Sequence, residues 1–240
     1  MAHRVTPYAH RGDHAGVIEN SDRAVQRAAS RRGFWLETDV RASADGQVVL
    51  AHDASLKRSW GVDWIVGETR WSQLASLEGP AGEHLTTLPE VLEAYPTLHI
   101  NIDPKDDAVV QPLLRVLRDA DALDRVLVTS FSANRIEWIR AHAPEIATGA
   151  SPVEVAALVV ASATTLPPGL WARRFDAVQV PPAAGPIKIV TPRFVATCHR
   201  LGVPVHVWTV NDRAVMERMV ACGVDGIMSD DLPIFANLHM

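Results

Sequence analysis

Three acidic residues give the strongest sign of a chemical site. Glu37 and Asp39 stand two apart in one strand-like segment, and Asp103 ends another. Side chains two apart share one face of a strand, and neighbouring carboxylates repel each other unless a proton or cation lies between them. Oxygen ligands suit Mg²⁺ or Ca²⁺ better than Zn²⁺. We therefore expect one divalent cation here, with Mn²⁺ as a third candidate. The structural alternative pairs the acids with Arg41 and Lys105.

Two histidines, His10 and His52, stand beside charged residues at the predicted ends of strands. Imidazole titrates near neutral pH, so two histidines flanking one reacting centre can serve as general acid and general base. Arg11 and Lys105 are candidates to bind phosphate oxygens. Each histidine alone has a structural interpretation, but their placement beside the acids favours catalysis.

The order of the elements predicts a scaffold that brings these strand ends together. Short β-branched segments alternate with segments of helical periodicity along the chain. Eight segments are typical of strands: 7–10, 35–40, 98–103, 126–131, 146–151, 176–180, 204–210 and 224–229. Helices are predicted at 22–32, 107–120, 134–143, 191–201 and 212–222. This alternation predicts an α/β fold, a closed TIM (β/α)8 barrel, with polar residues meeting at the C-terminal mouth.

We expect a single domain over residues 1–240. The connection that follows the second strand and its hairpin is longer than one strand-to-strand crossover of a barrel needs. Residues 54–87, after the second strand and a hairpin, form a predicted small insertion over the mouth and hold Trp60, Trp64 and Trp71. These tryptophans either line a substrate rim or pack the insertion. Buried aromatic area usually serves packing, which favours the second interpretation.

The composition excludes several classes of protein. Hydrophobic residues make up 48% of the chain and charged residues 21%, which excludes a disordered chain. The net charge is −5 and no Lys/Arg-rich run occurs, which argues against a nucleic-acid partner. Two cysteines cannot build a disulfide framework, so we expect a cytoplasmic location. No apolar run approaches the roughly 20 residues that span a bilayer, so no stable membrane insertion is expected. The oligomeric state stays open.

Short motifs recur in a fixed order from about residue 8 to residue 233. They are His10-Arg11-Gly12, Glu37-Thr38-Asp39-Val40, the segment 45–53 ending in His52-Asp53 with Leu56 and Arg58 following, the segment 87–92, Ser130-Phe131, the segment 207–211 and the segment 223–230. Each motif alone is weak, but the ordered set is specific. It resembles the glycerophosphodiester phosphodiesterase family, whose fold is a TIM barrel.

The resemblance implies roles for particular residues of this chain. They are the acid–base histidines His10 and His52, the metal ligands Glu37, Asp39 and Asp103, the phosphate-contacting Arg11 and Lys105, the supporting polar pair Glu19 and Asn20, and Trp208, which is expected to stack on the glycerol or head group.

Two departures from the family pattern affect these expectations. Asp103 stands where the family usually has Glu, so the metal preference is open. The tail Asp230-Asp231-Leu232-Pro233 replaces an Asp-x-Pro pattern, which we expect to concern barrel closure more than chemistry.

The predicted function is metal-dependent hydrolysis of small, water-soluble glycerophosphodiesters to sn-glycerol 3-phosphate and an alcohol by His/His acid–base catalysis. One alternative is a lysophospholipase D or sphingomyelinase-D-like phosphodiesterase; the insertion lacks the basic amphipathic helix that would favour a lipid. Another is a metal-dependent aldolase or isomerase barrel, which explains the acids but not the histidine motifs. A noncatalytic binding barrel would predict the loss of a key residue, and none is lost.

Overall fold

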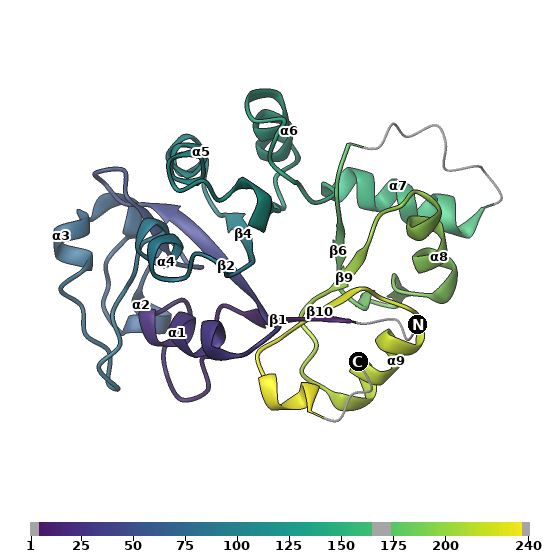
Figure 1. Cartoon of the computed structure of the whole chain (residues 1–240), viewed down its shortest axis with the longest axis horizontal. Coiled ribbons are helices and arrows are strands. Elements are labelled where there is room, and N and C mark those ends of the chain that lie inside the picture. Colours follow the sequence, from purple (N-terminus) through teal and green to yellow (C-terminus); the bar gives the residue numbers. More distant parts are fainter. Residues whose placement is uncertain (1–4, 165–173, 237–240) are drawn as a thin grey trace.

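Segments rich in Val and Ile form a ring of parallel strands in the computed structural model, which describes residues 5–164 and 174–236 (Figure 1). The named strands of the ring are β1 (Thr6–His10), β2 (Trp35–Ala42), β4 (Ile100–Pro104), β5 (Val126–Val128), β6 (Val178–Val180), β9 (Val205–Val207) and β10 (Gly226–Ser229). Their order around the ring is β5-β4-β2-β1-β10-β9-β6, and every neighbouring pair is parallel.

The space between β5 and β6 is closed by a short segment without a full strand. Thr148 forms a parallel bridge with Val128, and Gly149 forms one with Ala177. These bridges complete the predicted TIM (β/α)8 barrel. The predicted strand 146–151 is therefore reduced to one bridge on each side. Gly149 N donates to Val128 O at 2.9 Å and Ala150 N to Ala177 O at 2.8 Å, and glycine is required at 149 because a Cβ there would lie 2.5 Å from Thr129 Cγ2.

Helices follow the strands and surround the ring (Figure 1). They are α1 (Asp22–Ser30), α4 (Leu88–Ala94), α5 (Val110–Asp119), α6 (Ala133–His142), α7 (Pro152–Ala163), α8 (Pro192–Arg200) and α9 (Arg213–Ala221), with the 3₁₀ turns η2 (Leu123–Arg125) and η4 (Leu232–Phe235). Five of these helices have an N-cap residue whose side chain accepts a hydrogen bond from a backbone N–H of the first turn. These residues are Ser21, Thr87, Ser132, Thr191 and Asp212. Across the described part of the chain, no helix is long and apolar enough to cross a membrane.

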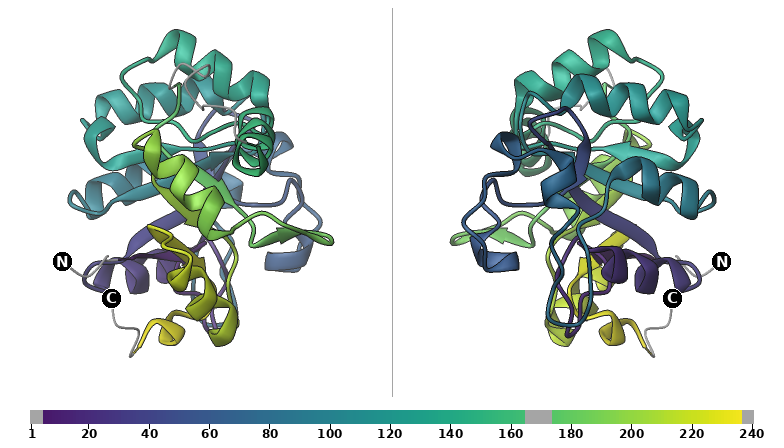
Figure 2. Two further views of the ribbon diagram at one scale, coloured as in Figure 1. Left: turned by 90° about the vertical axis from the view of Figure 1, so that its right-hand side faces the viewer. Right: turned by 90° about the vertical axis from the view of Figure 1, so that its left-hand side faces the viewer.

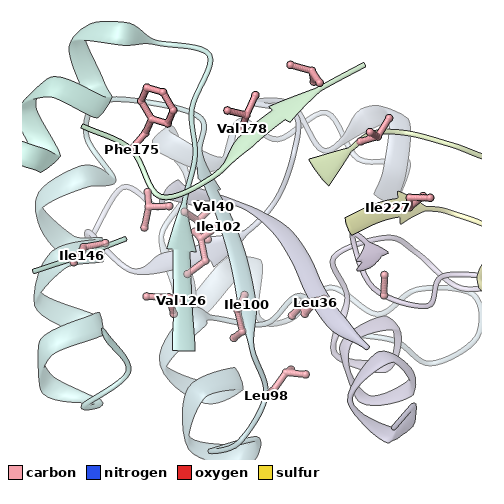
Figure 3. Packing of buried hydrophobic residues seen from close by; sticks show 14 of the residues in the cluster. Leu36, Val40, Leu98, Ile100, Ile102, Val126, Ile146, Phe175, Val178 and Ile227 are labelled. Atoms are coloured by element: carbon pink, nitrogen blue, oxygen red, sulfur yellow. The ribbon is translucent and has the colours of Figure 1, made fainter. Parts of the chain in front are cut away.

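Side-chain alternation along the strands separates the apolar layer from the polar interior of the barrel. Leu36 and Val40 of β2 lie in the buried layer with Ile100 and Ile102 of β4 (Figure 3). Burying each such side chain contributes roughly 1.5–3 kcal/mol to stability. Glu37 and Asp39, which alternate with Leu36 and Val40 along β2, point to the opposite face, so this layer fixes which carboxylates enter the barrel.

Aromatic rings fill the barrel interior beneath the strand ends. Tyr8 and His206 have ring centroids 5.2 Å apart, and Trp35 stacks on His99 at 4.5 Å. His206 is buried, which lowers its pKa to about 4, and its Nδ1 lies 3.3 Å from the Tyr8 hydroxyl. His206 is therefore a packing residue, as expected for a histidine this deep.

The insertion has a small core of its own. The insertion follows β3 (Val48–Leu50), the hairpin strand that pairs antiparallel with β2. It comprises the helices α2 (Lys57–Trp60) and α3 (Trp71–Leu74) and the 3₁₀ turn η1 (Val66–Glu68). Trp60, Trp64 and Trp71 pack against buried Leu56 and its neighbours, which supports the packing interpretation. The hairpin of β7 (Ala183–Ala184) and β8 (Ile187–Lys188) projects from the same side of the barrel as the insertion (Figure 2).

We predict that Gly12→Ala destabilises the barrel. Gly12 has φ +88°, and a Cβ there would lie 2.7 Å from the backbone carbon of Ala24, so the variant combines strain with a collision. We expect a loss of about 1–3 kcal/mol or more in urea unfolding. Gly16→Ala is the matched control, because Gly16 has φ +73° and a Cβ added there would meet no atom within 4 Å. Equal losses in the two variants would show that the contact with Ala24 contributes nothing.

Candidate active site

A cavity of about 240 Å³ lies at the carboxyl ends of the strands. Its wall includes most of the residues singled out by the sequence: His10, Arg11, Glu37, Asp39, His52, Asp103, Lys105 and Trp208. Glu19 and Asn20 are not part of the wall but contact residues that are. The barrel thus brings together residues spread over most of the chain.

Two buried carboxylates face each other across neighbouring strands. The register of β2 and β4 places Asp39 beside Asp103. The Nζ of Lys105 lies 2.8 Å from Asp39 Oδ1 and 2.6 Å from Asp103 Oδ2. Burial opposes ionisation of both acids; the Lys105 charge overcomes this at Asp39, whose pKa is lowered, but not at Asp103, whose pKa is raised. The ammonium therefore stands between two like charges.

The third carboxylate, Glu37, keeps a proton more readily than an exposed glutamate. Burial, and then the negative charge of Asp39, raise its pKa to about 7. Its Oε2 accepts a hydrogen bond of 3.1 Å from the backbone N–H of Arg11 and lies 3.8 Å from His10 Nε2. At neutral pH a proton on Glu37 is thus one way in which the cluster limits its negative charge.

Glu37, Asp39 and Asp103 offer only carboxylate oxygens, the donors that Mg²⁺ and Ca²⁺ prefer. Within residues 5–164 and 174–236, however, no group of three His, Cys, Asp or Glu side chains is arranged to hold a metal ion. The donor chemistry fits a divalent cation, while the predicted ligand set is not preassembled. Lys105 supplies the positive charge between Asp39 and Asp103.

His10 is oriented by a carboxylate from the far end of the chain. Its Nδ1 lies 2.6 Å from Asp230 Oδ1, which also lies 3.1 Å from His14 Nε2, and Asn211 donates to the other Asp230 oxygen. Burial disfavours the charged form of His10, but Glu37 and Asp230 outweigh it and raise the pKa of His10. The same hydrogen bonds lower the pKa of Asp230 against its own burial.

The expectation that this tail concerns barrel closure more than chemistry misses the contact of Asp230 with His10. A signal was present in the sequence: Asp230 directly follows β10, at the end of a barrel strand where functional residues gather.

His52 is held by a chain of polar contacts that ends at Arg11. His52 Nδ1 lies 2.7 Å from Asp53 Oδ1, and Arg58 Nε lies 2.5 Å from the other oxygen of Asp53. Arg58 also lies 2.6 Å from Glu19 Oε1, which Arg11 contacts at 2.9 Å. Arg58 belongs to α2, so the insertion supplies the guanidinium that links Asp53, the partner of His52, to Glu19, the partner of Arg11.

Asn20 supports the acids from behind the wall. Its side chain donates a 3.1 Å hydrogen bond to Asp39 Oδ2 and accepts one of 2.7 Å from Thr38 Oγ1. Its φ of +56° lies in the left-handed region, which asparagine enters more easily than most residues. Asn20 therefore fixes one oxygen of Asp39 while Lys105 holds the other.

We predict that Asp230→Asn lowers both the pKa of His10 and the turnover number. Asparagine removes the negative charge that helps His10 hold its proton, so an NMR titration is expected to show a lower pKa for His10. Loss of a carboxylate that orients a catalytic imidazole lowers kcat by roughly 10²–10⁴ in related arrangements. Asp231→Asn is the control, because it removes the same charge at an exposed neighbouring position. An unchanged His10 titration in Asp230→Asn would contradict this role.

Comparison with known proteins shows the family to which this chain belongs. Residues 10–233 match the model of the Glycerophosphoryl diester phosphodiesterase family. A Mycobacterium tuberculosis protein named "Probable glycerophosphodiester phosphodiesterase 2" is 32% identical over 226 residues, covering 92% of this chain and 86% of the relative. The Thermotoga maritima glycerophosphodiester phosphodiesterase structure is 25% identical, with a TM-score of 0.78 and 99% of each chain covered.

A second solved structure, an Oleispira antarctica phosphodiesterase in complex with the product sn-glycerol-3-phosphate, has the same fold. It is 22% identical, has a TM-score of 0.77, and the match covers 93% of this chain and 92% of that one. With a family match over nearly the whole chain, the histidines and acids at the barrel mouth belong to an enzyme of the glycerophosphoryl diester phosphodiesterase family.

Proposed function

We propose that this enzyme hydrolyses glycerophosphodiesters to sn-glycerol 3-phosphate and an alcohol, using His10 and His52 as the acid–base pair and a divalent cation. The observation that carries the proposal is that both imidazoles lie on the wall of one cavity, each with its Nδ1 against its own carboxylate. A carboxylate at Nδ1 fixes the ring and leaves Nε2 for the substrate.

The cations of the cavity suit a phosphodiester. Arg11 Nε is buried and has no hydrogen-bond partner among the described residues, although it lies 3.3 Å from Asp39 Oδ2. A buried donor left without a partner costs free energy, and a phosphate oxygen would satisfy it. The nearby Lys105 adds a second positive charge that offsets charge growing at phosphorus.

Proton transfer then falls to the two imidazoles. One takes a proton from the attacking hydroxyl or water, and the other gives a proton to the departing alcohol. Each positioned group of this kind contributes roughly 10²–10⁴ in rate. A divalent cation held by Glu37, Asp39 and Asp103 would, when bound, act as a Lewis acid on a phosphate oxygen.

The first test is product release. After EDTA treatment, the enzyme is assayed for sn-glycerol 3-phosphate released from glycerophosphocholine, glycerophosphoethanolamine and glycerophosphoglycerol, with Mg²⁺, Ca²⁺ or Mn²⁺ restored, beside lysophosphatidylcholine. We expect metal-dependent release from the water-soluble diesters. Cleavage of lysophosphatidylcholine alone would show that the substrates are lysolipids and not the water-soluble diesters. Full activity in EDTA would show that the reaction needs no divalent cation.

A second test examines the role of each residue by single substitutions. His10→Ala, His52→Ala and Glu37→Ala are each expected to lower kcat by at least about 10², because each removes a group from the cavity wall. The control is His142→Ala on the outer helix α6, where the ring stacks on Trp138 away from the cavity. Circular dichroism checks that each variant is folded. Near-normal diesterase activity in a folded cavity variant would contradict the role assigned to that residue.

A further inference from the structure

Arg135 lies on α6, one of the helices outside the ring (Figure 1), and is not part of the cavity wall. Its Nη1 donates to two acceptors, the backbone oxygen of Pro104 at 2.7 Å and Ser130 Oγ at 3.0 Å. Its Nε donates to Asp107 Oδ1 at 2.9 Å, and the side chain is only 14% exposed. One guanidinium therefore joins the end of β4 to the segment that follows β5.

The two acceptors of Nη1 stand directly before two residues of the cavity wall. Pro104 precedes Lys105, and Ser130 precedes Phe131. The Nζ of Lys105 lies 6.0 Å from the centre of the Phe131 ring, so these two side chains are neighbours in the wall. Because Arg135 holds the residue before each of them, it fixes where both stand relative to each other.

Backbone pairing does not fix this part of the mouth. Thr129 N donates to Ile102 O at 2.9 Å, and two residues further along β4 the Pro104 oxygen accepts from side chains instead, from Arg135 and from Ser130 Oγ at 3.4 Å. A buried carbonyl needs a donor, and a guanidinium offers several in fixed directions. Arg135 thus takes over where the ladder between β4 and the β5 segment ends.

Arg135 is poorly placed for the helix that carries it. It lies in the first turn of α6, where the helix dipole disfavours a cation. Arg140 lies in the last turn of the same helix, where a cation is favoured, and is 12% exposed. Its partners belong to the segment that closes the ring and to α7, namely Thr148, Gly149 and Glu154. A residue set against the preference of its own helix indicates a task at its acceptors.

From these contacts we propose that Arg135 is a positioning residue for the reaction, which holds Lys105 beside Phe131 at the place that the phosphate of the substrate requires. Arg135 touches no substrate itself. The proposal rests on the proposed function, in which Lys105 offsets charge growing at phosphorus. Without Arg135 the ammonium is still present but its backbone is free to shift, and a displacement of about 1 Å can cost 10²-fold in rate.

The experiment compares Arg135→Met with Arg140→Met, using whichever of the three water-soluble diesters the unaltered enzyme hydrolyses fastest. Each variant removes one largely buried guanidinium from α6 and keeps much of the aliphatic stem. We expect kcat/KM to fall about 10- to 100-fold in Arg135→Met and to stay within about twofold in Arg140→Met. Circular dichroism and urea unfolding check that both variants are folded and similarly stable.

Arg135→Lys is a second variant at the same position, for the case in which Arg135→Met does not fold. Lysine keeps a positive charge there, but a single ammonium cannot reproduce the planar fork that holds Pro104 and Ser130 together with Asp107. We therefore expect kcat/KM to fall at least about fivefold in Arg135→Lys as well.

A double-mutant cycle separates positioning from a general loss of order. If Arg135 acts through Lys105, then Arg135→Met lowers kcat/KM by no more than about threefold in an enzyme that already carries Lys105→Ala. A role in the fold alone would cost the same factor in both backgrounds, because the effects of independent residues add in free energy.

Each outcome is decisive. A loss in folded Arg135→Met or Arg135→Lys that is absent in Arg140→Met and shrinks beside Lys105→Ala supports the proposal. Near-normal kcat/KM in both Arg135 variants, an equal loss in Arg140→Met, or a loss that is unchanged beside Lys105→Ala overturns this inference and leaves the proposed function intact. Near-normal activity in Lys105→Ala, or no hydrolysis by the unaltered enzyme, overturns the proposed function at that point and this inference with it.

Discussion

The site depends on one electrostatic constraint, which is how to keep like charges together inside a barrel. Register between β2 and β4 sets Asp39 beside Asp103, and strand alternation adds Glu37 on the same face. Charges taken out of water need compensation, and Lys105 supplies it from two residues beyond Asp103. Burial, and then the charge of Asp39, raise the pKa of Glu37 to about 7, so near neutral pH Glu37 can hold a proton and lower the negative charge further. The apolar layer outside the strands matters to chemistry because it forces these acids inward.

A second constraint is that imidazoles must be held before they can work. The parallel pairing of β1 with β10 brings residue 10 close to residue 230, so the first strand presents a histidine and the last presents its carboxylate. His52 has no such neighbour in the ring and receives its carboxylate from the next residue. The insertion then braces Asp53 through Arg58. His10 is thus positioned by the pairing of the first and last strands, and His52 by Asp53 together with the insertion.

Much of the scaffold and site could be predicted because local patterns determine them. Alternation in β2 predicted that Glu37 and Asp39 share a face, and the β/α repeats predicted a barrel mouth for His10 and Lys105. The contact between Asp230 and His10 was not predicted. The position of Asp230 at a strand end makes it a candidate for the site, but no local pattern reports a partner 220 residues away in the sequence. The shortening of the segment 146–151 also escaped prediction, since its apolar pattern resembles that of a full strand.

The two isolated bridges at Thr148 and Gly149 give the ring a seam. Backbone hydrogen bonds close it on both sides, from Gly149 N to Val128 O at 2.9 Å and from Ala150 N to Ala177 O at 2.8 Å. In ring order the seam lies four places from β1 in either direction, on the side opposite the strand that carries His10. Ala150, directly after this seam, lies in the wall of a pocket of about 230 Å³ that shares Asp103 and Trp208 with the active-site cavity. Three strands separate this seam from β1 in either direction, so substitutions there can alter what the barrel mouth admits without disturbing the strand that carries His10.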